Sequence, residues 1–463
     1  MLEQPPGPAD RFLERRQGGG AEKPKMTPRN LVTAALLTVG LLAPQTAAAA
    51  TITTDGLDAA QPVRSGPAVA RAADTSGEPN LTDQWALASD QIMGILTAWR
   101  QVTGGETVVA IVDSGVDVSH RDLAPNIWTN AGEIPGNGAD DDHNGYVDDV
   151  NGYDFVDRDG NPADANGHGT HVAGIVGARG DNGLGGSGVA QRVRMMAVRV
   201  LDANAAGTTD NVAKGIRYAV DNGAKIVNLS LAGPSAGTEL ENAVAYAHSR
   251  GVLIVAAAGN QGRDLGAAPA FPVSLADDFV IGVAAINSQL HLADISNYGA
   301  GADIAAPGAD ILSTAVGGGY EWRTGTSMAA PAVAGTLALI AAARPDLGAE
   351  GLRDSLYAGA TAASLPVAYG QVNAAGALRK VIAPEAWKEA IPSKAPDIVT
   401  RSAADVRKAR AAEDARVRAA AAKKAAAKRL AACKKAKSAA AKKGKKVSKR
   451  CRVILKAAAK KKK

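Results

Sequence analysis

The sequence predicts an α/β fold, namely a mostly parallel sheet with helices on both faces, followed by a low-complexity basic C-terminal tail. Strand-like apolar runs alternate with amphipathic helical patterns, and the runs lie at 108–113, 193–201, 226–231 and 252–258. Repeated β-α-β order is typical of a parallel sheet that helices cover on both sides. The tail, residues 401–463, is almost all Ala, Lys and Arg.

The first 77 residues are predicted to be targeting and processing segments. Residues 31–43 are apolar, with Arg29 before them and a small-residue stretch after them, which is the shape of a cleaved secretory signal. Because this run is too short to span a bilayer, we expect a secreted protein without a stable transmembrane span. We assign 26–50 to the signal peptide, 1–25 to a non-native extension and 51–77 to a short pro-segment or linker.

Three polar residues stand at the ends of predicted elements. A β-branched run, 108–112, ends at Asp113, as a buried parallel strand does when it delivers a side chain at its carboxyl end. His168 lies between two glycines and opens an Ala/Val-rich helix, and Ser327 precedes the apolar helix 329–343. Pro331 is expected within the first turn of that helix, where its missing N–H costs little.

These residue types together predict a serine hydrolase. A serine nucleophile needs a neighbouring base, and the base needs a carboxylate that fixes its tautomer and stabilises its positive form. Ser327, His168 and Asp113 supply these roles. Taken alone, Ser327 is more typical of an ordinary helix cap than of a nucleophile, so the assignment depends on the presence of the other two.

The segments between these residues predict one continuous domain. Residues 209–222 place Val212, Ile216 and Ala219 on one helical face, and residues 239–250 do the same with Leu240, Val244 and Ala247. Each of these helices ends at a glycine. We therefore predict a catalytic domain over 78–380, a linker over 381–400 and the tail beyond it.

The chain resembles the subtilisin-like serine protease family (subtilases) from about Gln84 to about Ala375. The motifs that carry the resemblance are 111–116 (IVDSGV), 167–174 (GHGTHVAG), 228–231 (NLSL), 256–260 (AAAGN), 303–308 (DIAAPG) and 325–331 (GTSMAAP). The resemblance implies a secreted serine endopeptidase with Asp113, His168 and Ser327 as the triad and Asn260 as the oxyanion-hole residue. Subtilases commonly carry a longer folded pro-domain than residues 51–77 provide.

The resemblance also implies a substrate site. In this family a segment after the strand 226–231 stays extended and pairs with the peptide backbone. The residues just before Asn260 form one wall of the primary pocket, which holds the side chain that precedes the cleaved bond. In this sequence those residues are Ser230, Leu231, Ala232 and Gly233 for the extended segment, and Ala256, Ala257 and Ala258 for the wall. Ala232 replaces the glycine common there. Because no acid is evident at the pocket base, apolar residues before the cleaved bond are favoured.

Two loops are candidates for structural calcium. Asp140, Asp142 and Asn144 have the alternate oxygen spacing that converges on one hard cation, although a merely solvated acidic loop would have the same composition. The family resemblance implies a second site after the histidine helix. Its ligands would be Asp122, the Asn182 side chain and the carbonyls of Gly180, Leu184 and Gly186, with no clear match for an N-terminal ligand.

The net charge of +6 hides a strong asymmetry. Residues 401–463 hold 25 Lys and Arg against 3 Asp and Glu, so the tail carries +22 and the other 400 residues carry −16. Such a tail would attract polyanions, namely cell-wall polymers, an anionic membrane surface or nucleic acid, and retain the protein at the cell surface. A solubilising or dispensable tail is the alternative. Cys433 and Cys451 both lie there and could pair in an oxidising setting.

Three functions remain open at this point. The first is an active secreted serine endopeptidase. The second is a polyanion-binding surface protein whose subtilase-like domain is only a scaffold, and the third is an acyl hydrolase of another substrate. The intact set Asp113, His168, Ser327 and Asn260 favours an enzyme over a scaffold, and the extended segment after the strand 226–231 favours a peptide substrate.

Overall fold

The computed structural model describes residues 51–53, 64–66, 78 and 80–387. Its strands are β1 (Thr51–Thr53), β2 (Arg64–Gly66), β3 (Gly104–Asp113), β4 (Gly152–Asp154), β5 (Arg192–Arg199), β6 (Ala206–Thr208), β7 (Ile226–Leu229), β8 (Leu253–Ala257), β9 (Val280–Ile286), β10 (Ile304–Pro307), β11 (Ile311–Ala315) and β12 (Gly319–Arg323). Its helices are α2 (Asp90–Met93), α3 (Ile95–Gln101), α4 (His168–Gly177), α5 (Thr209–Asp221), α6 (Gly237–Ser249), α7 (Thr326–Ala343), α8 (Ala349–Gly359) and α9 (Ala374–Val381), with short 3-10 turns at Leu81–Asp83, Ala124–Asn126 and Pro384–Ala386.

A seven-stranded sheet in the order β10-β9-β8-β7-β3-β5-β4 forms the centre of the domain. All of its neighbouring strands are parallel. The predicted α/β architecture with a parallel sheet is therefore confirmed. β3 lies in the middle, and its last five residues, 109–113, are completely buried, as the β-branched run predicts.

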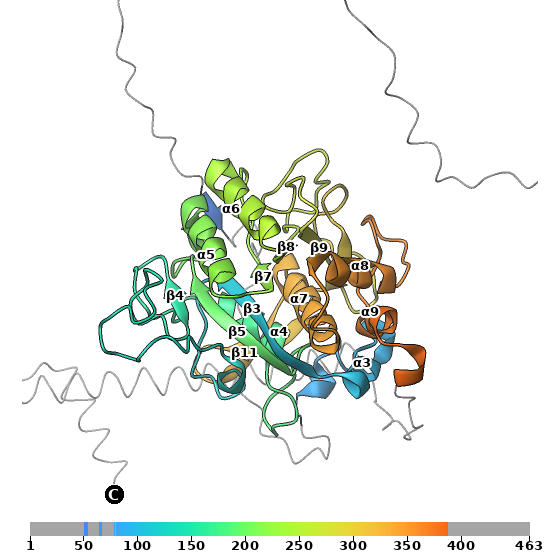
Figure 1. The fold of residues 1–463 in the computed structure, drawn as a ribbon. Helices are drawn as coiled ribbons and strands as arrows, with labels where there is room; N and C mark the ends of the chain where they lie inside the picture. Colours follow the sequence, from blue (N-terminus) through green and yellow to red (C-terminus); the bar gives the residue numbers. More distant parts are fainter. Residues whose placement is uncertain (1–50, 54–63, 67–77, 79, 388–463) are drawn as a thin grey trace, which may run out of the picture. The chain divides into compact units, whose positions relative to one another are not determined.

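Helices cover the two faces of this sheet in pairs (Figure 1). Helices α4 and α7 contact each other, and α5 contacts α6. The apolar faces predicted for α5 and α6 are buried, including Val212, Ile216, Leu240 and Val244. Helix α5 begins where the Thr208 side chain accepts a hydrogen bond from the Asn211 N–H, which caps its first turn.

Helix α7 is the core helix of the domain and consists mainly of small apolar residues. Within the described residues it is the one helix long and apolar enough to cross a membrane by length and composition, and 89% of it is buried inside the fold. It packs against β3, β7, β8, β9 and β10 and against α4, α8 and α9. Its start, which carries Ser327, is thereby held at the sheet.

Two small antiparallel sheets involve residues before the predicted catalytic domain. Strand β1 pairs with β6, and β2 pairs with β12 in the order β11-β12-β2. No pattern in the sequence indicates these two strands, which belong to the region expected to be a short pro-segment. The predicted N-terminal extension, the signal peptide, the basic tail and the Cys433–Cys451 pairing lie outside the described residues and stay predictions.

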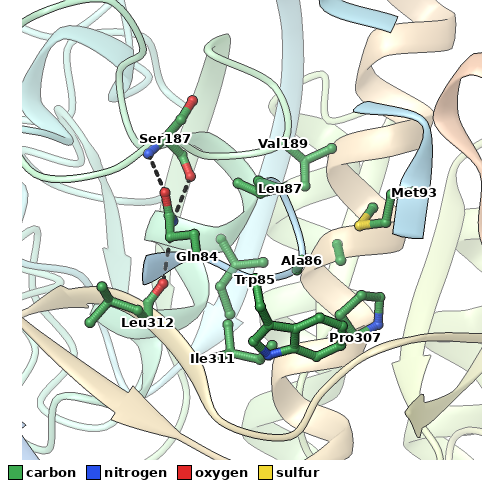
Figure 2. Close-up of a pocket in the computed structure, with 12 residues that line it drawn as sticks. Gln84, Trp85, Ala86, Leu87, Met93, Ser187, Val189, Pro307, Ile311 and Leu312 are labelled. Carbon is green, nitrogen blue, oxygen red and sulfur yellow. Dashed lines mark hydrogen bonds between the residues drawn. The ribbon is translucent and has the colours of Figure 1, made fainter. Parts of the chain in front are cut away.

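A small apolar cavity lies beneath the segment that leads into α2 and is bounded by residues of α4 and α7 (Figure 2). Gln84 closes one side, because its side chain donates to the Ser187 carbonyl (2.9 Å) and accepts from the Ser187 N–H (2.8 Å). The residues that line it do not include Asp113, His168 or Ser327. We interpret it as a packing gap under this segment.

Candidate active site

The three residues predicted to carry the chemistry lie at the ends of their elements. Asp113 is the last residue of β3, His168 is the first residue of α4, and Ser327 is the second residue of α7. All three are fully buried. Helices α4 and α7 pack against each other, and both pack on β3. The fold therefore holds the starts of these two helices near the carboxyl end of β3, where Asp113 lies.

The Asp113–His168 pair has the geometry of a carboxylate that orients an imidazole. The two atoms Asp113 Oδ1 and His168 Nδ1 are 2.7 Å apart. The same Oδ1 also accepts the Ser114 N–H at 2.7 Å. Gly169 follows the histidine, and a Cβ there would lie 2.1 Å from the Gly115 carbonyl oxygen. A glycine is therefore needed for α4 to approach the end of β3 so closely.

Asp164 fastens the start of α4 to the strand, and the sequence analysis missed it. Its Oδ1 accepts the Gly167 N–H (2.7 Å) and the Ser114 hydroxyl (2.9 Å), while its Oδ2 accepts the N–H and hydroxyl of Thr170. A carboxylate is favourable at a helix N-terminus because the N–H groups there lack partners within the helix. An acid four residues before the helix-opening His168 is the signal that could have revealed it.

The start of α7 corrects the expectation for Pro331. Helix α7 begins at Thr326, so Pro331 is its sixth residue and lies inside the helix rather than in its first turn. Its missing N–H would otherwise donate to the carbonyl four residues earlier, which is that of Ser327. The Ser230 hydroxyl donates to this carbonyl instead, at 2.8 Å. The proline thus leaves the Ser327 carbonyl without a donor from its own helix, and Ser230, which follows β7, supplies one.

Asn260 is oriented by Thr326, a residue that the sequence analysis did not single out. The Asn260 Oδ1 accepts both the backbone N–H (2.8 Å) and the hydroxyl (3.0 Å) of Thr326. The Thr326 hydroxyl in turn accepts the Gly259 N–H at 2.9 Å. Because these bonds fix which end of the amide is oxygen, the Asn260 Nδ2 is directed elsewhere, and it is buried without a hydrogen-bond partner among the described residues.

The residues expected to bind substrate follow β7 and end β8. Ser230 and Leu231 are fully buried, and the Ser327 hydroxyl lies 3.4 Å from the Ser230 carbonyl oxygen. Ala232 and Gly233 continue this segment, and Gly233 pairs with Phe271 through two 2.9 Å backbone hydrogen bonds. The three expected wall residues, Ala256, Ala257 and Ala258, are fully buried at the carboxyl end of β8.

The acidic loop forms one cluster that could hold a cation. Carboxylate oxygens of Glu133, Asp140 and Asp142 all lie within 4.8 Å of one another. Glu133 was not predicted. Its Oε1 accepts the Asp142 N–H, while its Oε2 is buried without a hydrogen-bond partner among the described residues. Asn144 lies beside this cluster, and its side-chain amide donates to Asp142 at 3.2 Å.

Asp122 and Asn182, two residues of the second predicted cation site, are in contact. The Asn182 amide donates to Asp122 Oδ1 at 2.7 Å, and Gly180, Leu184 and Gly186 lie on the same loop as Asn182. The structure adds Glu78, whose Oε1 accepts the Asn182 N–H at 3.1 Å and whose Oε2 is buried without a partner among the described residues. Burial raises the pKa of Glu78 to about 8 and that of Asp122 to about 6. Glu78 stands where the sequence analysis found no N-terminal ligand.

Comparison with known proteins agrees with this geometry. A model of the subtilase family matches residues 104–380. The "Thermophilic serine proteinase" of Bacillus sp. (strain AK1) is 44% identical over 246 residues, which cover 53% of this chain and 54% of that protein. Thermitase of Thermoactinomyces vulgaris is 41% identical over 244 residues, which cover 53% of this chain and 78% of thermitase. A solved structure of a protease from Pseudoalteromonas arctica PAMC 21717 aligns with a TM-score of 0.56 and 31% identity, covering 66% of this chain and 99% of that one.

The chain thus spans about half the length of the Bacillus relative and most of thermitase. The family match includes β3, α4 and α7, which carry the carboxylate, the imidazole and the serine described above. The predicted resemblance is confirmed, and this protein belongs to the subtilase family, a family of serine endopeptidases.

Proposed function

We propose that this protein is a secreted serine endopeptidase that cleaves peptide bonds through an acyl-enzyme intermediate. The observation that carries the proposal is the 2.7 Å contact between Asp113 Oδ1 and His168 Nδ1, at the sheet edge where α7 presents Ser327. Family membership supports the same chemistry. In this proposal Ser327 is the nucleophile, His168 the general base and then acid, and Asp113 the group that orients it.

Each step of the reaction has a residue to perform it. Ser327 Oγ attacks the carbonyl carbon while His168 takes its proton, and His168 then gives that proton to the leaving amine. Water attacks the resulting ester by the same proton route. Asn260 Nδ2 would donate to the oxyanion, because its Oδ1 is already held by Thr326. Because the Asn260 amide is already oriented, it would not have to reorient when the negative charge develops, and it would therefore stabilise the oxyanion effectively.

A fluorophosphonate probe tests the assignment of the nucleophile. It should label the wild-type protein and leave Ser327→Ala unlabelled. The matched control is Ser249→Ala, which removes an exposed serine hydroxyl of α6 outside the triad and the substrate segment and should still be labelled. Labelling of Ser327→Ala at the wild-type rate would refute the assignment.

The substrate site is proposed to be the segment Ser230–Gly233, which would pair with an extended peptide backbone, with residues 256–258 forming one wall of the primary pocket. Strand addition of this kind is indifferent to most side chains. The wall consists of small alanines. We therefore propose a preference for apolar residues before the cleaved bond, which cleavage profiling with a peptide library would measure.

Calcium is the cofactor that these loops fit best. Hard carboxylate and carbonyl oxygens are its preferred ligands, and both clusters contain a buried carboxylate oxygen without a protein partner among the described residues. Glu133, Asp140 and Asp142 would hold one ion, and Glu78 and Asp122 with the 180–186 loop another. Its contribution would be stability of the native state, RT ln(1 + [L]/Kd) for each site.

Chelation tests this assignment directly. Excess chelator should lower the Tm of Ser327→Ala protein, in which self-digestion cannot contribute. Replacing both Asp140 and Asp142 with Ala should remove part of that sensitivity, whereas replacing the exposed Asp210 of α5 should leave it intact. A Tm that does not change in chelator would exclude a stabilising ion under those conditions.

Export by the predicted signal over 26–50 and retention at the cell surface by the tail over 401–463 complete the proposal. Charge complementarity supports retention, because a segment carrying +22 is attracted to polyanions while the rest of the chain carries −16.

A further inference from the structure

The side chain of Arg323 lies beside the residue that precedes His168. Arg323 is the last residue of β12 and stands four positions before Ser327. An ideal Cβ on Gly167, the residue before His168, would lie 3.2 Å from Arg323 Nη2. Gly167 has a φ of +105°, a conformation that favours a residue without a side chain. The guanidinium therefore lies against the backbone that presents the imidazole.

The hairpin formed by β11 and β12 holds Arg323 in this place. Two hydroxyl groups of β11 donate to backbone carbonyls in the first turn of α4, each at 2.7 Å. The His171 Nε2 lies 3.1 Å from the Glu321 carbonyl oxygen, which fastens β12 to the same helix. Because the hairpin is bonded to the turn of α4 that begins at His168, Arg323 keeps a fixed position beside that turn.

The guanidinium is largely shielded from water but only partly paired. Its Nε donates to Glu321 Oε1 at 2.7 Å, and only 10% of the Arg323 side chain and 6% of the Glu321 side chain are exposed. A guanidinium carries five N–H donors, so four remain on its two terminal nitrogens. Within the described residues these nitrogens donate to no protein acceptor, and they are not enclosed. Such a fork binds a carboxylate through two parallel hydrogen bonds.

Val316 adds an apolar group to the same place. It directly follows β11, it is 50% exposed, and its Cγ2 would lie 3.9 Å from the same ideal Cβ on Gly167. The space beside Gly167 is thus bounded by a valine methyl group and by the guanidinium of Arg323. A glutamate side chain has the matching chemistry, because two methylene groups precede its carboxylate.

The position of β12 places this space on the leaving-group side of the cleaved bond. The acyl half of a substrate is proposed to pair with Ser230–Gly233, which continue from β7 of the central sheet. Strand β12 belongs to a different sheet, β11-β12-β2, which contacts α4 through β11. The two halves of a peptide leave the reacting carbon in opposite directions, and His168 protonates the leaving amine. The residue that carries this amine therefore extends past His168 toward Gly167 and Arg323.

We propose that Arg323 is a specificity-determining residue that selects glutamate as the first residue after the cleaved bond. The terminal nitrogens of Arg323 donate to the glutamate carboxylate, and Val316 contacts its methylene groups. The inference rests on the proposed function, which defines the half of the peptide that leaves first. It adds a charge requirement on the leaving half to the apolar preference proposed for the acyl half.

Two quenched fluorescent peptides that differ only in Glu or Gln at this residue test the preference through kcat/KM. The full-length wild-type chain should cleave the Glu peptide about tenfold more efficiently, and high salt should reduce this ratio. Glu321→Gln combined with Arg323→Gln removes both charges without leaving one unpaired, and it should bring the ratio to within twofold of one. The matched control is Arg344→Gln with Asp346→Asn, an ion pair of the same sequence spacing at the far end of α7, which should keep the wild-type ratio.

Binding of the product half needs no catalysis, so it separates this proposal from the proposed function. Glu-Ala-Ala-Ala and Gln-Ala-Ala-Ala, each with fluorescein at the carboxyl terminus, are titrated against the Ser327→Ala chain, and the Glu peptide should bind about tenfold more tightly. This difference without any cleavage by the wild-type chain would retain the Arg323 site and refute the peptidase function. The proposal is overturned if a wild-type chain that cleaves both peptides shows a ratio within twofold of one. Where nothing is cleaved, it is overturned if the two product peptides bind alike or not at all. A tenfold preference that persists in the double variant of Glu321 and Arg323 would also overturn it.

Discussion

Replacing Ser230 should weaken the fold, and replacing Pro331 should compensate for part of that loss. In Ser230→Ala, two fully buried groups lose their hydrogen-bond partner: the Ser327 carbonyl and the Asn228 amide, whose Nδ2 donates to Ser230 Oγ at 3.0 Å. Pro331→Ala creates a backbone N–H whose helical acceptor is the same Ser327 carbonyl. The double variant therefore regains one of the two lost bonds.

The magnitudes follow from the burial of these groups. Each buried polar group left without a partner costs about 1–3 kcal/mol, so Ser230→Ala carries this cost twice. Restoring a donor to the Ser327 carbonyl removes one of the two costs. We therefore expect a coupling free energy of about 1–2 kcal/mol between the two substitutions, well above the ~0.5 kcal/mol scatter of independent sites.

Urea unfolding of four chains measures this coupling, with Ser327→Ala in every chain to prevent self-digestion. The control pairs Ser230→Ala with Thr336→Val. Thr336 is also a buried α7 hydroxyl, but it donates to the Ala332 carbonyl of its own helix at 2.9 Å, so additive effects are expected. Additivity for Ser230→Ala and Pro331→Ala would refute the reasoning that the proline leaves the Ser327 carbonyl to the serine.

Three further outcomes are expected. Asn260→Ala should lower kcat by about 10²–10³-fold with little change in KM, which is the loss known for the oxyanion-hole asparagine of a subtilisin; equal kcat in the variant would exclude an oxyanion contact. Burial raises the pKa of Asp303 to about 6, so its protonated form is favoured in the folded state and stability falls as pH rises from about 4 to 6. The unfolding free energy of Asp303→Asn minus that of wild type should therefore increase by about 3 kcal/mol between pH 4 and 7, and a pH-independent difference would contradict this sign. A chain ending at Pro396 should cleave short peptides like the full chain but lose low-salt binding to polyanions, and loss of peptide turnover in a folded truncated chain would place the tail in the catalytic domain.

The positions of Asp113, His168 and Ser327 at the ends of their elements could be predicted because each residue sits in a local pattern. Asp113 ends a β-branched run, and His168 and Ser327 open apolar helices, and in the structure these residues lie at the ends of β3, α4 and α7. These patterns are properties of short windows, and a single sequence contains them. The order of the strands in the sheet and the packing of α4 against α7 could not be predicted in this way, because they depend on contacts between segments far apart in the sequence.

The supporting residues act through contacts between distant segments, which no short window contains. Thr326 orients Asn260 from 66 positions away, and Glu78 reaches Asn182 from 104 positions away. Strand β1 has only three residues, too few to show a periodic pattern. Its conformation therefore depends on its pairing with β6. The effect of Pro331 was misjudged because it depends on the first residue of α7, and helix boundaries are the least certain part of a sequence-based prediction.

The position of β1 ahead of the whole domain has a consequence for the order of events during synthesis. Residues 51–53 leave the ribosome before β6, before Ala232 and long before Ser327. When α7 finally docks and completes the site, the strand is already attached to the chain and available. A chain synthesised only as far as β12 would therefore contain both β1 and its partner β6 but not Ser327, so the proposed activity would appear only when α7 is complete.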